Sequence, residues 1–421
     1  MTEKLLQFLW RLQYFNTSSL ITTQGQSLQI LHPGIINTNQ GPDFFNARIL
    51  INNITWAGAV ELHLLTSAWE RHGHTGDSHY DNVVLHVVWQ HDKDVNDIPV
   101  LELCSRVPKV LLEQYNRWME SAGFIPCASR AAAVPGIVWK SWKERLAAER
   151  LQRKADGILA QVEKSKGHWE EVCWWQMARA FGGVINGDSF GQIAASLPIT
   201  LLAKCKASRE QTECLLLGQA GLLSDHLAEQ DSYLLHLAKE YRHLQLKYSL
   251  QPVAAPLYYF RMRPPAFPDT RLAQLAALVY QSVHLFSKIR EEKELTVVKS
   301  WLSSPVSSYW QHHYRAGVRV SKTISGPGRA FVDHVVINTV CPLLYAYGHY
   351  HTIDLFKEKA ITWLLAAAAE NNHITRQFAA AGVSAANALE SQALIELKTN
   401  YCTSRRCLDC AAGASLLRCR E

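Results

Sequence analysis

Hydrophobic residues follow two different periods along the chain, and the change falls near residue 125. Before it, a helical pattern over Glu3–Phe15 is followed by short runs of alternating or continuously apolar residues, which are typical of β-strands. Asn52-Asn53 separates two of these runs and favours a tight turn. The pattern predicts strands at Leu20–Thr23, Leu28–Leu31, Ala47–Ile51, Ala59–Leu64, Asn82–Trp89 and Pro99–Cys104, then a helix at Val110–Met119.

Beyond a linker at Pro126–Pro135, almost every segment has helical periodicity interrupted by Gly and Pro. The sequence therefore predicts three parts: an α+β domain with a small mixed sheet over 1–125, a large all-α domain over 126–400, and a Cys-rich tail over 401–421. The helices are expected at Trp139–Glu163, Trp169–Ala180, Ser208–Gly218, Arg271–Lys288, Phe331–Tyr347, Asp354–Glu370 and Ala388–Tyr401.

Composition narrows the class of protein. A chain of 421 residues with 48% hydrophobic and 19% charged residues fits two or three globular domains. It has no run of 18 apolar residues and no basic-then-apolar start, so we expect a cytoplasmic protein without a membrane span. The net charge of +6 is modest, but between Lys140 and Lys166 eight Lys/Arg face four Asp/Glu. Such a helix is usually a solvated face, and it also suits phosphate contact.

The predicted hairpin carries the strongest chemical signal. Asp43 precedes its first strand, and Glu61 and His63 point to one face of its second strand. Two acids at the ends of paired strands suit Mg²⁺ or Mn²⁺, which would activate water, while His63 would orient that water. In the structural alternative, Gly-Pro-Asp is an ordinary turn and Glu61 a solvent-facing strand residue.

Histidines are concentrated directly after this hairpin. Six of the chain's eighteen fall between positions 63 and 91, in and after the segment TSAWERHGHTGDSHYDNVVLHVV. His72, His74 and Asp77 are expected to assist the acids from a Gly-containing loop. Alternatively, His63, His72 and His74 with a carboxylate form a Zn²⁺ site, because imidazole suits zinc better than magnesium. His86, in the middle of a strand, is expected to be a core histidine.

Four cysteines close the chain with the spacing C-x4-C-x2-C-x8-C: Cys402, Cys407, Cys410 and Cys419. Four thiolates fit either a Zn²⁺ ion or a [4Fe–4S] cluster. The alternative is a terminal helix with exposed thiols.

Two groups of arginines are expected to contact nucleic acid. Arg405 and Arg406 flank the cysteines and would form a basic tip. Arg261 and Arg263 lie beside aromatic residues in RMRPPAFPDTR, a combination that holds phosphate and stacked bases. Such a turn more often packs two helices.

The hairpin resembles the PD-(D/E)XK nuclease superfamily. Pro42-Asp43 stands where that superfamily has its Pro-Asp pair, and Glu61-Leu62-His63 stands where it has Glu-x-Lys. The resemblance implies a restriction-endonuclease-like fold, metal binding by both acids, and an extra acid at Glu3. His63 departs from the pattern, since a neutral imidazole brings no fixed positive charge.

Nearly the whole chain is also similar to a family of bacterial proteins known only as a domain of unknown function. The segments that carry this similarity are QGPDFFNARI, GAVELHL with HGHTGDSHYDNVVLHVVW, RPPAFPDTRLAQLA and SQALIELKTNYCTSRRCLDC. This similarity implies no activity.

Three hypotheses follow. The first is a metal-dependent nuclease that acts on DNA or RNA, the second a non-catalytic nucleic-acid-binding or scaffold protein, and the third a zinc hydrolase of another substrate. The oligomeric state stays open.

Overall fold

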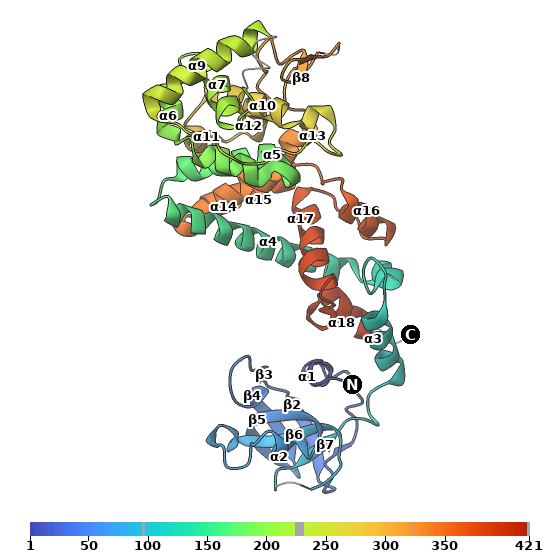
Figure 1. Cartoon of the computed structure of the whole chain (residues 1–421). Helices are drawn as coiled ribbons and strands as arrows, with labels where there is room; N and C mark the ends of the chain where they lie inside the picture. Colours follow the sequence, from blue (N-terminus) through green and yellow to red (C-terminus); the bar gives the residue numbers. More distant parts are fainter. Residues whose placement is uncertain (95–96, 224–230, 322, 419–421) are drawn as a thin grey trace. The chain divides into compact units, whose positions relative to one another are not determined.

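A computed structural model describes residues 1–94, 97–223, 231–321 and 323–418. An N-terminal mixed sheet is followed by a helical region, as the hydrophobic pattern predicts (Figure 1). The chain forms two compact units. The first comprises Met1–Trp142, Gln377–Val383 and Leu397–Glu421, and the second comprises Lys143–Arg376 and Ser384–Glu396. The Cys-rich segment therefore groups with the sheet, although the whole helical region separates them in sequence.

The first unit is built on a seven-stranded sheet in the order β1-β2-β4-β5-β6-β7, with β3 paired to β4. The pairs from β1 to β5 are antiparallel, whereas β5 pairs with β6, and β6 with β7, in parallel. The strands are β1 (Leu20–Ile21), β2 (Ser27–His32), β3 (Ile35–Ile36), β4 (Phe44–Ile51), β5 (Ile54–Leu65), β6 (Val83–Gln90) and β7 (Val100–Glu102).

The hairpin β4–β5 forms as predicted because Asn52 and Asn53 both adopt positive φ, of 46° and 63°, which suits the tight turns that join twisted strands. Near its open end the pairing shifts register between Phe44 and Ala47. This irregularity sets Phe44 opposite Val60, so that Asp43 lies next to Glu61.

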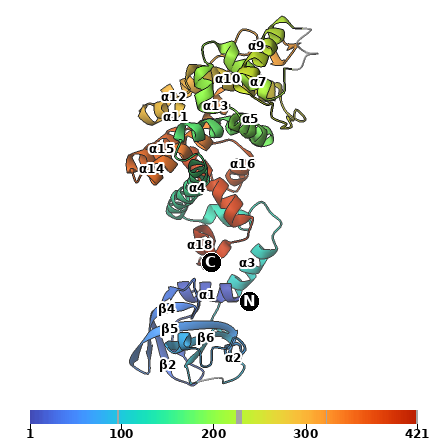
Figure 2. The same ribbon diagram turned by 60° about the vertical axis from the view of Figure 1, so that its left-hand side comes forward.

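Short helices border the sheet. α1 (Glu3–Leu12) begins at Thr2, whose side chain accepts the Leu5 N–H, and contacts β5 (Figure 2). It ends before the predicted Phe15 because Gln13 is left-handed, with φ of 52°. The four-residue α2 (Ala68–Arg71) follows β5.

The rest of the first unit gathers three parts of the chain. α3 (Lys109–Glu120) and the 3₁₀ helix η2 (Ala128–Ala133) follow the sheet. The C-terminal segment forms the π-helix η5 (Leu397–Cys402), the 3₁₀ helix η6 (Cys407–Asp409) and α18 (Ala411–Arg418). α18 packs against both α3 and η2.

The second unit is helical apart from one small β-hairpin, and one large core cluster runs through it. Its described helices are α4 (Gly136–Lys164, which starts in the first unit), α5 (Trp169–Ala195), α6 (Ile199–Lys204), α7 (Arg209–Gln219), α9 (Ser232–Tyr248), η3 (Pro264–Ala266), α10 (Pro268–Gln281), α11 (Leu285–Glu291), α12 (Leu295–Leu302), α13 (Arg329–Val335), η4 (Val336–Val340), α14 (Cys341–Tyr350), α15 (Asp354–Ala366), α16 (His373–Ala380, whose last residues belong to the first unit) and α17 (Ala388–Glu396). The hairpin strands are β8 (His313–Arg315) and β9 (Val318–Arg319).

Three predicted helices are interrupted or change type in the structure, among them Phe331–Tyr347, which becomes the π-helix η4 at Val336–Val340. The helix expected over Arg271–Lys288 is wrong as a single element, because Ser282 is extended, with φ of −161° and ψ of 124°, and separates α10 from α11. The one expected over Ala388–Tyr401 continues as a π-helix from Leu397, a local widening often found at functional sites.

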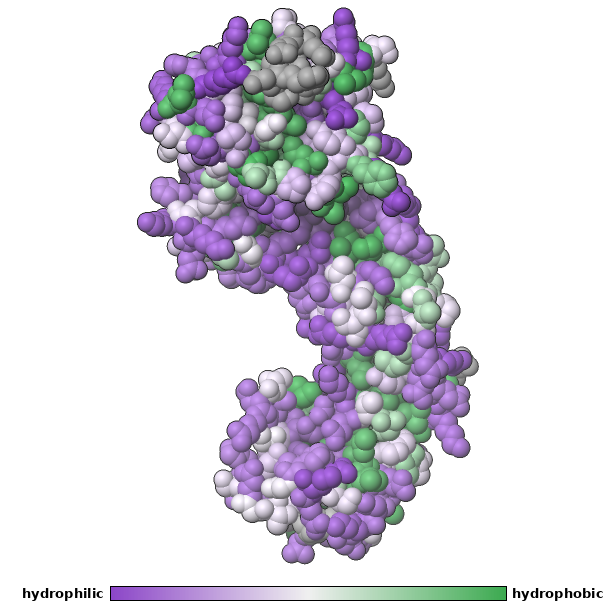
Figure 3. All heavy atoms as spheres, in the orientation of Figure 1, coloured by the Kyte–Doolittle hydropathy of each residue, from purple (hydrophilic) through white to green (hydrophobic). Residues whose placement is uncertain are grey.

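One helical stretch, Arg329–Tyr350, has the length and apolar composition of a membrane span. Its most apolar window is 61% buried within the protein, and the core helix of a globular domain passes the same test. On the face drawn in Figure 3, most of the surface is hydrophilic, and hydrophobic residues lie in small groups among the hydrophilic ones.

Candidate metal centre

Asp43 and Glu61 are held together by hydrogen bonds across the β4–β5 hairpin. The Asp43 N–H donates to Glu61 Oε2 at 3.0 Å, and the Leu62 N–H donates to Asp43 Oδ2 at 3.1 Å. The side-chain amide of Gln7 on α1 donates to the other Asp43 oxygen at 2.7 Å. The two acids predicted from the hairpin pattern are therefore adjacent, and each has a defined orientation.

Burial makes both carboxyl groups hard to ionise. Burial, together with the smaller effect of the neighbouring Asp43, raises the pKa of Glu61 to about 8. Burial also raises the pKa of Asp43 to about 6, against the opposing effect of its hydrogen bonds. Glu3 on α1 adds a smaller repulsion to both groups, so the third acid suggested by the nuclease resemblance faces the same place.

Three imidazoles lie together beside the Glu61 carboxylate, which contacts two of them. One ring nitrogen each of His63, His72 and His74 lies within 4.8 Å of the others. His63 Nε2 is 3.1 Å from His72 Nδ1, and Glu61 Oε1 is 3.5 Å from Nε2 of both His63 and His74. Four potential ligand atoms thus converge from β5 and from the segment that follows it.

Local structure explains the convergence. His72 ends the single turn of α2, and Gly73 then takes a left-handed φ of 75° that reverses the chain. His74 is brought back over the turn, where its N–H donates to Trp69 O at 3.2 Å. The His74 ring packs against two aromatic rings. Tyr80 stacks on it with ring centroids 3.8 Å apart, and Trp69 meets it edge-on with centroids 5.4 Å apart.

The charge state of the rings suits metal binding. Burial lowers the pKa of His63 to about 3 and lowers that of His74, which keeps both imidazoles neutral, the form that ligates metal. His74 Nε2 is buried and has no hydrogen-bond partner among the described residues. An unpaired buried nitrogen is costly, and a cation at this point would satisfy it. The residues therefore fit a divalent metal.

His86 is buried, as expected of a core histidine, and it also contacts the His–Glu group. It is fully buried on β6, opposite Glu61 in the parallel register. Its Nε2 lies 2.9 Å from His63 Nδ1, the ring nitrogen that faces away from the other ligands. A partner at that nitrogen fixes the orientation of a ligating imidazole. The signal in the sequence was one more histidine, but its role depends on how β5 and β6 pair.

Asp77 does not join this group. Its carboxylate caps the short helix η1 (Ser78–Tyr80) and lies 2.7 Å from His79 Nδ1, in an exposed position. Its influence on the site is limited to an electrostatic effect on His74.

The four predicted arginines belong to two different units. Arg261 and Arg263 are exposed in the second unit, and Arg261 lies over the Phe260 ring at 5.1 Å. Arg406 pairs with Asp409 at 3.0 Å, and Arg405 binds carbonyl oxygens at the end of α3, both in the first unit. The structure brings none of the four to the His–Glu group among its described contacts.

Three of the four C-terminal cysteines have described positions. Cys407 and Cys410 are buried, Cys402 is partly buried, and all three are free thiols. Cys419 lies outside the described residues.

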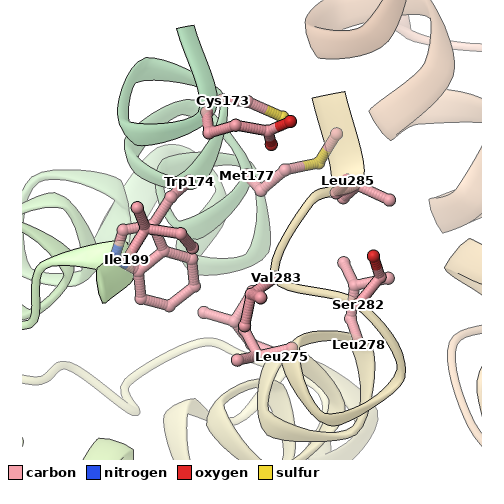
Figure 4. Close-up of a pocket in the computed structure, with 11 residues that line it drawn as sticks. Cys173, Trp174, Met177, Ile199, Leu275, Leu278, Ser282, Val283 and Leu285 are labelled. Carbon is pink, nitrogen blue, oxygen red and sulfur yellow. The ribbon is translucent and has the colours of Figure 1, made fainter. Parts of the chain in front are cut away.

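A small pocket in the second unit lies beside α5, α6 and α10 and is lined mostly by apolar side chains (Figure 4). Its acidic residue is Glu170, whose carboxylate accepts the N–H groups of Phe286 and Ser287 at 3.0 and 2.8 Å and so caps α11. The pocket carries no convergent reactive groups.

Comparison with known proteins places the chain in one family. Residues 3–373 match the family described as "Protein of unknown function (DUF2851)", so the chain belongs to that family. The matched range includes the His–Glu group and ends before the C-terminal cysteines. No curated protein and no solved structure matches the chain.

Proposed function

We propose that the first unit is a metal-dependent hydrolase that cleaves nucleic-acid phosphodiesters, with the metal held by Glu61, His63, His72 and His74. The observation that carries this proposal is a group of three imidazole nitrogens, two of which lie 3.5 Å from a buried carboxylate that is paired with a second acid. A divalent ion bound there would supply Lewis acidity toward a phosphoryl oxygen and toward water.

The ligand set favours Mn²⁺ or Zn²⁺ over Mg²⁺. Imidazole is a good ligand for the transition metals, whereas magnesium prefers an all-oxygen shell. We therefore propose Mn²⁺ or Zn²⁺ in place of the Mg²⁺ or Mn²⁺ expected from the sequence. Glu61 would bind the metal directly, and Asp43 would lie beside it.

Each residue has a role that its position supports. Glu61 and the histidines bind the metal, and the exposed His72 marks the side of the site that opens to solvent. Asp43, held by Gln7 and Leu62, is placed to accept a proton from attacking water or to complete the metal shell. His86 orients His63.

The restriction-endonuclease-like fold is part of the same proposal. The chain runs through a helix, antiparallel strands with the hairpin β4–β5, a short helix and then β6 parallel to β5. The Pro-Asp pair precedes the first hairpin strand, and Glu-x-His lies within the second. Both features are in the order implied by the resemblance.

A second candidate is a zinc hydrolase of a different substrate. It is favoured by the three histidines, because three imidazoles with a carboxylate make a typical zinc set. A nucleic acid partner and a cytoplasmic location belong to the first candidate only.

The test separates metal binding from chemistry. Metal-stripped protein is titrated with Mn²⁺, Zn²⁺ and Mg²⁺ by calorimetry, then assayed on single- and double-stranded DNA and on RNA. We expect His74→Ala to lose both binding and cleavage. His79→Ala is the matched control, because that imidazole is exposed and pairs with Asp77. Metal binding without nucleic-acid cleavage would favour the second candidate, a zinc hydrolase of another substrate. Equal metal binding by wild type and His74→Ala would refute both candidates.

A further inference from the structure

Four cysteine thiols lie near one another in the first unit: the three described C-terminal ones and a fourth from an earlier part of the chain. Cys127, at the start of η2, lies with Cys402, Cys407 and Cys410 of the C-terminal segment, and in each of the six possible pairs one thiol raises the pKa of another. Such repulsion requires short distances. Cys127 is remote in sequence from the other three, so the fold and not the local spacing brings it to them.

Specific contacts hold the Cys127 segment against the C-terminal one. Lys398, on the π-helix that ends at Cys402, donates to Phe124 O at 2.6 Å, and its ammonium group lies over the Phe124 ring at 4.8 Å. Arg405, between Cys402 and Cys407, donates to Ser121 O at 3.2 Å. α18 packs on η2 directly after Cys127.

The surroundings of the sulfurs suit thiolates bound to a cation. The backbone N–H groups of Ala412 and Gly413 donate to Cys410, as N–H groups commonly do toward metal-bound sulfur. Gly413 is needed for this turn, since a Cβ there would lie 2.3 Å from Cys407 O. Among the described cysteines no disulfide forms, so the thiols stay available.

The spacing of the sulfurs distinguishes two metals. Four sulfurs at ~2.3 Å from one tetrahedral zinc lie about 3.8 Å apart. Among the described residues, however, the group whose ligand atoms all fall within 4.8 Å of one another is the histidine group, so no three of these sulfurs are that close. A cluster of iron and sulfide stands between its thiolates and holds them wider apart.

We propose that Cys127, Cys402, Cys407 and Cys410 bind a [4Fe–4S] cluster, and that Cys419 is not a ligand. On assembly each thiol releases its proton to solvent as its sulfur bonds to one iron. Two ferrous ions, two ferric ions and four inorganic sulfides are the co-reactants, so the cluster forms without oxidation or reduction of the protein. The bound cluster would tie the C-terminal segment to the chain around residue 127 and so complete the first unit.

The test counts acid-labile sulfide, which reports a cluster and ignores any metal on the histidines. Full-length protein is prepared anaerobically with equal amounts of ferrous and ferric iron and with sulfide, then measured by absorbance, by iron and sulfide content and by native mass spectrometry. The His74→Ala protein, which keeps all its cysteines but loses a histidine of the other site, is expected to be brown, with about four irons and four sulfides per chain. One zinc per chain in a colourless protein without sulfide would overturn the proposal.

Four single variants assign the ligands. Cys127→Ser and Cys410→Ser are expected to lose most of the sulfide, whereas Cys419→Ser and Cys104→Ser keep it. Cys104 is the matched control, a free cysteine of the same unit whose thiol donates to Glu102. Circular dichroism shows whether each variant is folded. A folded Cys127→Ser protein with full sulfide, or loss of sulfide in Cys419→Ser, would contradict this ligand set, and the native mass of wild type tests the cluster even where a variant fails to fold.

Discussion

Replacing Glu61 by Gln is expected to stabilise the metal-free protein while it removes metal binding. In the fold, Glu61 is 6% exposed and its pKa is raised from 4.5 to about 8 by burial and by Asp43. A carboxyl group with a raised pKa holds its proton more tightly in the folded state than in the unfolded state. Its contribution to stability is therefore complete below pH 4.5 and is lost as the pH rises to about 8.

The free-energy cost follows from the difference between the ordinary pKa of Glu61 and its raised pKa in the fold. At about 1.4 kcal/mol per pH unit, the ionisation preference costs the metal-free protein about 4 kcal/mol at pH 8 and below about 1 kcal/mol at pH 5. Glutamine keeps the acceptor for the Asp43 N–H and offers its amide to the unpaired His74 Nε2. The variant should therefore melt on the order of 10 °C higher at pH 8, since about 2–4 °C corresponds to 1 kcal/mol in a unit of this size.

The assay is thermal unfolding in chelator at pH 5 and pH 8, repeated with Mn²⁺ or Zn²⁺. Wild type should gain stability from the metal, about 3 kcal/mol at a hundredfold excess over Kd, and the variant should gain almost none. A Glu61→Gln protein that is less stable than wild type at pH 8 in chelator would refute the reasoning, because Glu61 would then act as a structural hydrogen-bonding residue.

Three further outcomes test other parts of the structure. His86→Ala should weaken metal binding about 10–100-fold in calorimetry, because it removes the partner of His63 Nδ1. Burial raises the pKa of Glu213 to about 7, so this group should lower the stability of the second unit by about 2.5 kcal/mol in urea titrations between pH 5 and pH 8, and Glu213→Gln should remove that part of the pH dependence. Gly58→Ala should lower the free energy of unfolding by about 1–3 kcal/mol and so lower the melting temperature, because the added Cβ would lie 2.5 Å from Asn82 O, just before β6. An unchanged melting temperature would show that the β5–β6 pairing can shift.

Local patterns predicted the elements that local chemistry determines. The alternation on either side of Asn52-Asn53 gave the hairpin and hence the pairing of Asp43 with Glu61, because a tight turn sets the register of its strands. The histidines near position 72 were recognised as a group, although their convergence depends on α2 and the reversal at Gly73.

Long-range pairing was beyond the reach of such patterns. His86 supports His63 only because β6 lies parallel to β5, and a parallel register has no turn to reveal it. Cys127 joins the C-terminal cysteines through tertiary contacts such as that of Lys398, whereas the predicted partner Cys419 was chosen for its spacing alone. The break at Ser282 carries neither Gly nor Pro, so the helical period continued through it.

The arrangement at Glu61 argues for a cation on energetic grounds. Two adjacent carboxyl groups are buried together, and the imidazoles beside them are kept neutral and so provide no compensating charge. A sheet selected for stability alone would place apolar side chains here, since a buried acid without a partner weakens the fold. A divalent ion bound here would offset the cost of burying the two acids, because it neutralises their charge. It would also use the free lone pairs of the neutral rings, including that of His74. His63, at the position where the nuclease resemblance expects a lysine, is consistent with this reasoning: a lysine would compete with the metal for the carboxylates, whereas an imidazole adds a ligand.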